Sequence, residues 1–129
     1  MDTQVDELVG MGLTAWSKAY APYSKFVVGA AVKCKSGAVL VGASIENRSF
    51  GLTICAERVA MCSAVAVGEQ DFVAIAVTAD SDEPIVPCGA CQQFLAEFNP
   101  DLISLGRPYA ASGRSKIFRI FSPTRPVEF

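Results

Sequence analysis

The stretch FVAIAVTAD, residues 72–80, decides the fold class of this 129-residue chain. It is apolar at almost every position, which is typical of a central strand covered on both faces. Such a strand lies in a sheet that has helices above and below it, and the segments on either side have helical patterns. The sequence therefore predicts an α/β protein.

The other elements follow from apolar spacing and from the residues that break it. A helix is expected at the start, ended by Pro22, and a hairpin follows it. The whole chain, 1–129, is expected to form one domain with a mixed sheet between helices. The expected elements are, in chain order, a helix at 4–20, strands at 26–34 and 38–45, a helix at 55–67, a strand at 72–80, a helix at 88–98, and strands at 101–106 and 115–121.

The composition narrows the classes of function. The net charge is −2, so there is no electrostatic case for binding a polynucleotide. No apolar run reaches the length of a membrane span, and the first ten residues lack the basic segment of a secretory signal. We therefore expect a cytoplasmic protein whose cysteines are ligands, catalysts or buried apolar residues rather than disulfides.

Five cysteines and no histidine restrict any metal site to sulfur and oxygen ligands. Cys88 and Cys91 lie three residues apart at an expected helix start, and Cys55 also begins a helix, where thiolates are favoured. Three thiolates occupy three corners of a tetrahedron around zinc and leave one position open, as in catalytic sites. Cys34 and Cys62 are expected to be ordinary buried cysteines.

The segment TICAERVAM, residues 53–61, places charged groups beside the first of these ligands. Glu57 comes two residues after Cys55, where it can take a proton from water at the metal and pass it to a substrate. Arg58 follows at once. A guanidinium that donates to a ligand sulfur withdraws charge from a zinc ion with three thiolates, which predicts a tuning role for Arg58.

CAE at 55–57 followed by PCGAC at 87–91 resembles the signature of the zinc-dependent cytidine deaminases. The likeness extends over about residues 10–100, through APYSKF, VGAA, IEN and GLTICAER, to the small homotetrameric members with three cysteine ligands. The resemblance implies a three-layer α/β/α fold with a five-stranded mixed sheet. It also implies Zn²⁺ as cofactor and a hydrolase acting on a cyclic amidine, which converts cytidine or deoxycytidine to uridine or deoxyuridine and releases ammonia for pyrimidine salvage.

The same resemblance implies roles for further residues. Phe26 would pack against the base, Glu46 would hold a ribose hydroxyl, and the backbone N–H of Ala56 would meet the pyrimidine carbonyl oxygen. Glu57 would protonate ring N3 and then the departing amino group. The partners implied are a small nucleoside and other copies of the chain, in a homotetramer whose sites are completed across subunits.

The sequence departs from the family pattern at three places. These departures concern residues expected to bind the substrate and none of the expected metal ligands. Ser44 stands where the family has an asparagine that helps to hold the sugar, and Phe50 stands where it has a tyrosine. In the tail, the family has an aromatic residue that reaches the site of a neighbouring subunit. In this chain that residue is Phe121 or Phe129, or it is absent. These departures leave a second substrate class open, namely another cytosine-bearing small molecule such as blasticidin S or a modified cytidine.

Two other classes of function are weighed against a nucleoside deaminase. A polynucleotide editor is disfavoured by the short acidic chain, which has no basic groove. A zinc-stabilised module without activity is disfavoured by the open fourth position of the expected site and by the carboxylate of Glu57 beside it.

Overall fold

The computed structural model describes residues 3–79, 87–108 and 116–119. They form a five-stranded sheet with the strand order β2-β1-β3-β4-β5, accompanied by three α-helices and one short 3₁₀ helix. The elements are α1 (Thr3–Trp16), β1 (Val28–Cys34), β2 (Val39–Ala43), η1 (Phe50–Leu52), α2 (Ala56–Ala66), β3 (Phe72–Ala79), α3 (Gly89–Ala96), β4 (Ile103–Pro108) and β5 (Lys116–Arg119).

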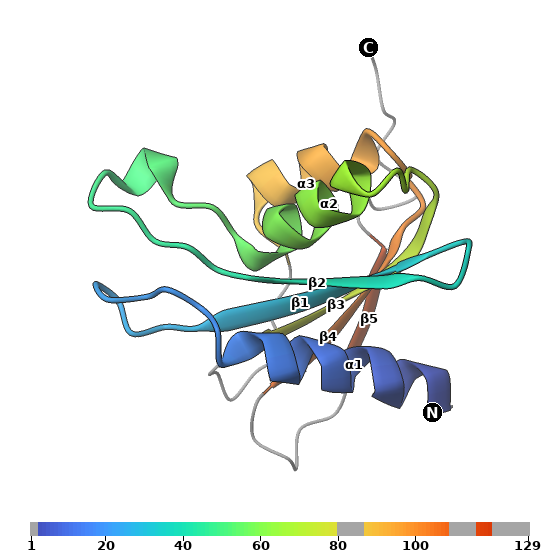
Figure 1. Cartoon of the computed structure of the whole chain (residues 1–129), viewed down its shortest axis with the longest axis horizontal. Helices are drawn as coiled ribbons and strands as arrows, with labels where there is room; N and C mark the ends of the chain where they lie inside the picture. Colours follow the sequence, from blue (N-terminus) through green and yellow to red (C-terminus); the bar gives the residue numbers. More distant parts are fainter. Residues whose placement is uncertain (1–2, 80–86, 109–115, 120–129) are drawn as a thin grey trace.

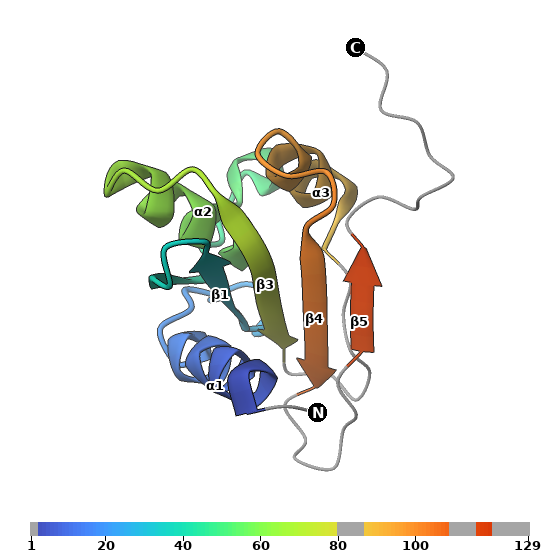
Figure 2. The same cartoon turned by 90° about the vertical axis from the view of Figure 1, so that its right-hand side faces the viewer.

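The helices lie on both faces of the sheet, α1 on one side and α2 with α3 on the other, as Figure 1 shows and as the turned view in Figure 2 confirms. β3 occupies the middle of the sheet, antiparallel to β1 and parallel to β4, and β5 is an edge strand. The expected three-layer α/β/α architecture with a five-stranded mixed sheet is therefore confirmed, and so is the central place of the apolar stretch that begins at Phe72.

Each face of the sheet has its own core. On the side of α2 and α3, the largest fully buried side chains are Met61, Ile75, Leu95 and Leu102. On the side of α1, Leu8 and Val9 pack on strand residues that include Ala31 and Ala76. Because alternate residues of β3 point to opposite faces, the strand contributes to both cores, which explains why its sequence is nearly all apolar.

Two glycines let the helices approach the sheet closely. A Cβ atom on Gly42 of β2 would lie 2.4 Å from the backbone nitrogen of Ala60 and 2.6 Å from the carbonyl oxygen of Ala56, both in α2. A Cβ atom on Gly29 of β1 would lie 2.2 Å from the carbonyl oxygen of Gly12 in α1. The absence of a side chain at Gly42 therefore lets the first turn of α2 pack directly on β2. This turn carries part of the candidate site.

The structure corrects two expected boundaries near the N-terminus. The first helix was expected to continue to residue 20 but ends at Trp16. The reason is tertiary, because the backbone of Tyr20 pairs with the chain beyond β2: its N–H donates to Ser44 at 2.8 Å, and its carbonyl accepts from Glu46 at 2.8 Å. The strand expected from residue 26 begins at Val28 for a local reason, since the amide of Phe26 donates to the side chain of Ser24.

The expectation for the two spare cysteines is half right. Cys34 is buried in β1, with 1% of its surface exposed, as predicted. Cys62 is exposed on α2, so its expected burial is wrong. The buried side of α2 is formed by Ala56, Glu57, Ala60, Met61 and Ala64, and Cys62 does not lie on it.

The remaining structural expectations concern the tail and the membrane. Phe121 and Phe129 lie outside the described residues, so the structure does not test whether either supplies an aromatic to a neighbouring site. Within the described ranges, no helix combines the length and the apolar character that a membrane crossing requires.

Candidate metal and catalytic site

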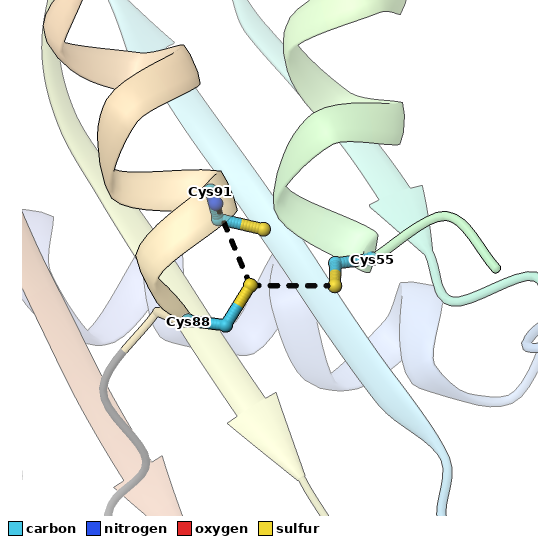
Figure 3. Close-up of side chains that lie close together, drawn as sticks. All are labelled: Cys55, Cys88 and Cys91. Atoms are coloured by element: carbon cyan, nitrogen blue, oxygen red, sulfur yellow. Dashed lines mark hydrogen bonds between the residues drawn. The ribbon is translucent and has the colours of Figure 1, made fainter. Parts of the chain in front are cut away.

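The three predicted ligands lie at the first turns of two helices that share one face of the sheet. Cys55 and Cys88 are the N-cap residues of α2 and α3, each in extended backbone conformation, and Cys91 lies in the first turn of α3. The Sγ atoms of Cys55 and Cys88 are 3.8 Å apart, and the amide of Cys91 donates to Cys88 Sγ at 3.4 Å. Figure 3 shows the three thiols converging on one point between the helix ends.

This cluster fits a zinc ion. All three sulfurs lie within 4.8 Å of one another. Sulfurs bound about 2.3 Å from one tetrahedral zinc ion are themselves about 3.8 Å apart, which matches the separation of Cys55 and Cys88. Soft thiolates are ligands that zinc prefers, and three of them leave a fourth position for water or substrate. Within the described part of the chain, no other group of three potential ligand side chains meets this criterion.

The electrostatics around the sulfurs favour thiolate at Cys55. The hydrogen bond from the Cys91 thiol, helped by Arg58 and Cys88, lowers the pKa of Cys55 to about 5. The same bond, followed by burial, raises the pKa of Cys91. The Nη2 atom of Arg58 lies 3.6 Å from Cys55 Sγ and 3.3 Å from the carbonyl oxygen of Thr53. The bond to Cys55 also raises the pKa of the guanidinium, so Arg58 stays charged.

Glu57 is the buried carboxyl group of this site. It lies in the first turn of α2, with only 4% of its surface exposed. Burial is the main cause that raises the pKa of Glu57 to about 7, and the neighbouring Cys55 thiolate contributes to the rise. A carboxyl group with such a pKa takes up and gives back a proton near neutral pH, which is what proton transfer requires.

A cavity of about 260 Å³ opens in front of the sulfurs. It is lined by every predicted site residue except Cys91 and Arg58. The other residues that line it are Val28, Phe50 and Thr53. The carboxylate of Glu46 and the ring of Phe26 lie at the wall that the loops before β1 and after β2 provide. Segments far apart in the sequence thus enclose one space the size of a small molecule.

The side chains expected to hold the sugar already have partners in the protein. Ser44 is buried, and its Oγ accepts a hydrogen bond from the amide of Val28 at 3.2 Å. Glu46 accepts bonds from the backbone amides of Tyr23 and Ser24, both at 3.1 Å, and from the hydroxyl of Ser24. Because the site sits at the first turn of α2, the backbone N–H of Ala56 belongs to the four that a helix leaves without an intrahelical acceptor.

Comparison with known proteins agrees with this geometry. Residues 2–106 match the family profile described as the cytidine and deoxycytidylate deaminase zinc-binding region. The chain belongs to the cytidine and deoxycytidylate deaminase family. Over 100 residues it is 52% identical to a cytidine deaminase of Halalkalibacterium halodurans, covering 78% of this chain and 74% of that protein.

The chain is also similar to a solved structure and to a more distant relative. The crystal structure of cytidine deaminase from Burkholderia pseudomallei superposes with a TM-score of 0.81 at 41% identity, over 90% of this chain and 92% of that one. A blasticidin-S deaminase of Bacillus cereus is 34% identical over 90 residues, 64% of each chain. Both the identity and the matched length are lower than for the cytidine deaminase of Halalkalibacterium halodurans.

Sequence reasoning missed Ser24 and Thr53. Ser24 lies in the quoted motif APYSKF, but nothing in its spacing shows that its hydroxyl meets a glutamate 22 residues away. Thr53 has a carbonyl that accepts from Arg58 and a wall position in the cavity. Only its place just before Cys55 signalled a possible role.

Proposed function

We propose that this deaminase converts cytidine and deoxycytidine to uridine and deoxyuridine with water and releases ammonia, as a zinc-dependent hydrolase acting on a cyclic amidine. One observation carries the proposal. Three thiols lie within 4.8 Å of one another, and two of them, those of Cys55 and Cys88, line a cavity of about 260 Å³ together with the buried residue Glu57. That combination is built to activate water beside a small polar ring.

Cys55, Cys88 and Cys91 hold the zinc ion in this proposal. When bound, zinc supplies the Lewis acidity that makes a water molecule nucleophilic near neutral pH. Arg58 donates to Cys55 Sγ and draws charge away from that ligand. Glu57 takes one proton from the water that attacks C4 and gives it to ring N3. It then takes the remaining proton of the same oxygen and gives it to the amino group, which leaves as ammonia as the C4–N bond breaks.

The remaining walls orient the nucleoside. Phe26 lies beside the base, because its ring is an apolar wall of the cavity and is 41% exposed without a substrate. The amide of Ala56 points its N–H toward the pyrimidine carbonyl oxygen, where the positive end of the α2 dipole favours a partial negative charge. Glu46 accepts a sugar hydroxyl, and Ser44, whose oxygen already accepts from Val28, has a hydroxyl proton to donate.

The experiment that tests the function is ammonia release over a panel of cytidine, deoxycytidine, blasticidin S and N4-substituted cytidines. We expect cytidine and deoxycytidine to have the highest kcat/KM. If blasticidin S or a modified cytidine turned over far faster, Ser44 would mark a different substrate class. Binding of single-stranded DNA or RNA at physiological salt would instead favour a polynucleotide substrate.

The proposal includes a homotetramer in the cytoplasm that serves pyrimidine salvage, with sites completed between subunits. Support comes from the segment around η1, which stands away from the sheet in Figure 1 and exposes 89% of Phe50 and 66% of Leu52. Phe50 also lines the cavity, so a second copy that covered this segment would close the site. Light scattering at micromolar concentration tests this, and a monomer would contradict it.

A further inference from the structure

We infer that Ser24 is a positioning residue, which fixes the carboxylate of Glu46 and the backbone of Phe26 relative to each other across the substrate cavity. The inference rests on the proposed function, because it concerns the grip on the nucleoside. Ser24 is not itself a wall of the cavity, whereas Glu46 and Phe26 are. Its effect on the substrate is therefore transmitted through these two residues.

The carboxylate of Glu46 is held by three donors from two successive residues. Its Oε1 accepts the backbone amides of Tyr23 and Ser24, each at 3.1 Å, and its Oε2 accepts the hydroxyl of Ser24. A carboxylate offers about four acceptor sites. The three bonds therefore leave about one, on Oε2, for a hydroxyl of a bound molecule.

The same hydroxyl reaches Phe26. The Ser24 Oγ accepts the amide of Phe26 at 3.0 Å while it donates to Glu46, so the two contacts form one polarised chain of hydrogen bonds. The residue between them, Lys25, has a φ of 64°, which is uncommon for a residue with a side chain. Such a conformation is strained and persists where surrounding bonds hold it.

The loops that carry these groups are also joined at their bases. The amide of Tyr20 donates to Ser44, and the amide of Glu46 donates back to Tyr20, both at 2.8 Å. These backbone bonds bring the two loops side by side but do not set the direction of the Glu46 side chain. That direction is set by the bonds from Tyr23 and Ser24, and among the described residues Ser24 is the one whose side chain bonds to both Glu46 and the backbone of Phe26.

The charge state of Glu46 agrees with this arrangement. The hydrogen bond from the Ser24 hydroxyl is the largest cause that lowers its pKa, and the amides of Ser24 and Tyr23 add to the effect. Glu46 is then an ionised group that accepts hydrogen bonds and donates none. It favours a neutral hydroxyl over an anionic substituent at that end of the cavity.

The test compares Ser24→Ala with Ser24→Thr, which keeps a hydroxyl, and with Ser17→Ala. Ser17 is a matched control because its hydroxyl also makes one bond to a protein group, the carbonyl oxygen of Thr14 at 3.0 Å, at an exposed site after α1. Four quantities are measured on the zinc-loaded protein: the Kd of uridine by calorimetry, KM and kcat for cytidine, and the melting temperature.

We expect Ser24→Ala to weaken uridine binding and to raise KM about tenfold, because a bond to a charged acceptor is lost, while kcat changes by less than about threefold. Ser24→Thr should restore both constants, and Ser17→Ala should leave them unchanged. A purely structural role would lower the melting temperature without separating KM from kcat.

The outcomes are distinguishable. An active wild type whose Ser24→Ala variant binds uridine equally well, or loses kcat and not affinity, overturns the inference alone. A wild-type protein that releases no ammonia from any member of the panel overturns the proposed function, and the inference with it.

Discussion

The Sγ atoms of Cys55 and Cys88 lie 3.8 Å apart although 33 residues separate them along the chain. Both residues cap helices, α2 and α3, that pack on the same face of the sheet, so the two caps meet. Helix N-termini lower thiol pKa values and leave amides free to meet negative charge. Because the N-termini of α2 and α3 lie next to each other, the cysteines and Glu57 come together at one end of the cavity.

Replacing Glu57 by glutamine should abolish proton transfer and leave the fold intact. The amide has nearly the size and shape of the carboxyl group, so glutamine should fit the buried position of Glu57. We expect ammonia release from cytidine to fall by about a hundredfold to ten-thousandfold, with the zinc content unchanged. Colorimetric ammonia assays and metal analysis by mass spectrometry measure the two quantities.

The control for that variant is Glu97→Gln, which makes the same chemical change at the exposed end of α3. Its activity should equal that of the wild type. Full activity in Glu57→Gln would show that another group transfers the proton. A loss of zinc would show that Glu57 stabilises the metal site.

Gly42→Ala should displace the first turn of α2. Its Cβ would lie 2.4 Å from the backbone nitrogen of Ala60, so the helix must move, at a cost of about 3 kcal/mol in the free energy of unfolding. Gly29→Ala makes the same kind of clash with α1 on the opposite face. Both variants should melt at a lower temperature, but only Gly42→Ala should weaken zinc binding in a competition titration with a chelator. Equal zinc affinities in the two variants would contradict this.

Arg58→Gln should weaken the metal site without unfolding the protein. The substitution removes the donor that lies 3.6 Å from Cys55 Sγ and the charge that favours its thiolate. We expect a loss of about tenfold to a hundredfold in zinc affinity or in kcat. Lys18→Gln, which removes a positive charge from an exposed position after α1, is the control. Equal effects of the two substitutions would show that only net charge matters.

The buried thiol of Cys34 should make the free energy of unfolding fall as the pH rises into the alkaline range. Burial, with the nearby Glu69 carboxylate as a second cause, raises its pKa above 9.0. The folded protein therefore holds the thiol proton more tightly than the unfolded chain. This contribution is complete below pH 9.0 and is lost as the pH rises through the raised pKa. Urea titrations of the wild type and Cys34→Ala should give a constant difference in the free energy of unfolding below pH 9.0 and a shrinking one above it. A constant difference at every pH would refute the assignment.

Much of the fold and the metal site could be predicted because the information is local. An apolar run such as 72–79 is typical of a strand covered on both faces, and the order of helices and strands around it leaves few arrangements. Likewise, cysteines at helix starts in a chain without histidine indicate a sulfur site. Boundaries were less predictable. α1 stops at Trp16 because Tyr20 pairs with Ser44, a partner that periodicity cannot reveal.

The sequence by itself determined the kinds of chemical group at the site and the element on which each lies, because hydrophobic period, helix caps and ligand type act over a few residues. Only the tertiary structure decided that Cys62 is exposed, that Gly42 seats α2, and that Ser24 connects Glu46 to Phe26. The physical reason is distance. A hydrogen bond or a backbone contact depends on atoms brought within a few ångströms by folding, and no pattern along the chain records which distant segment will lie there.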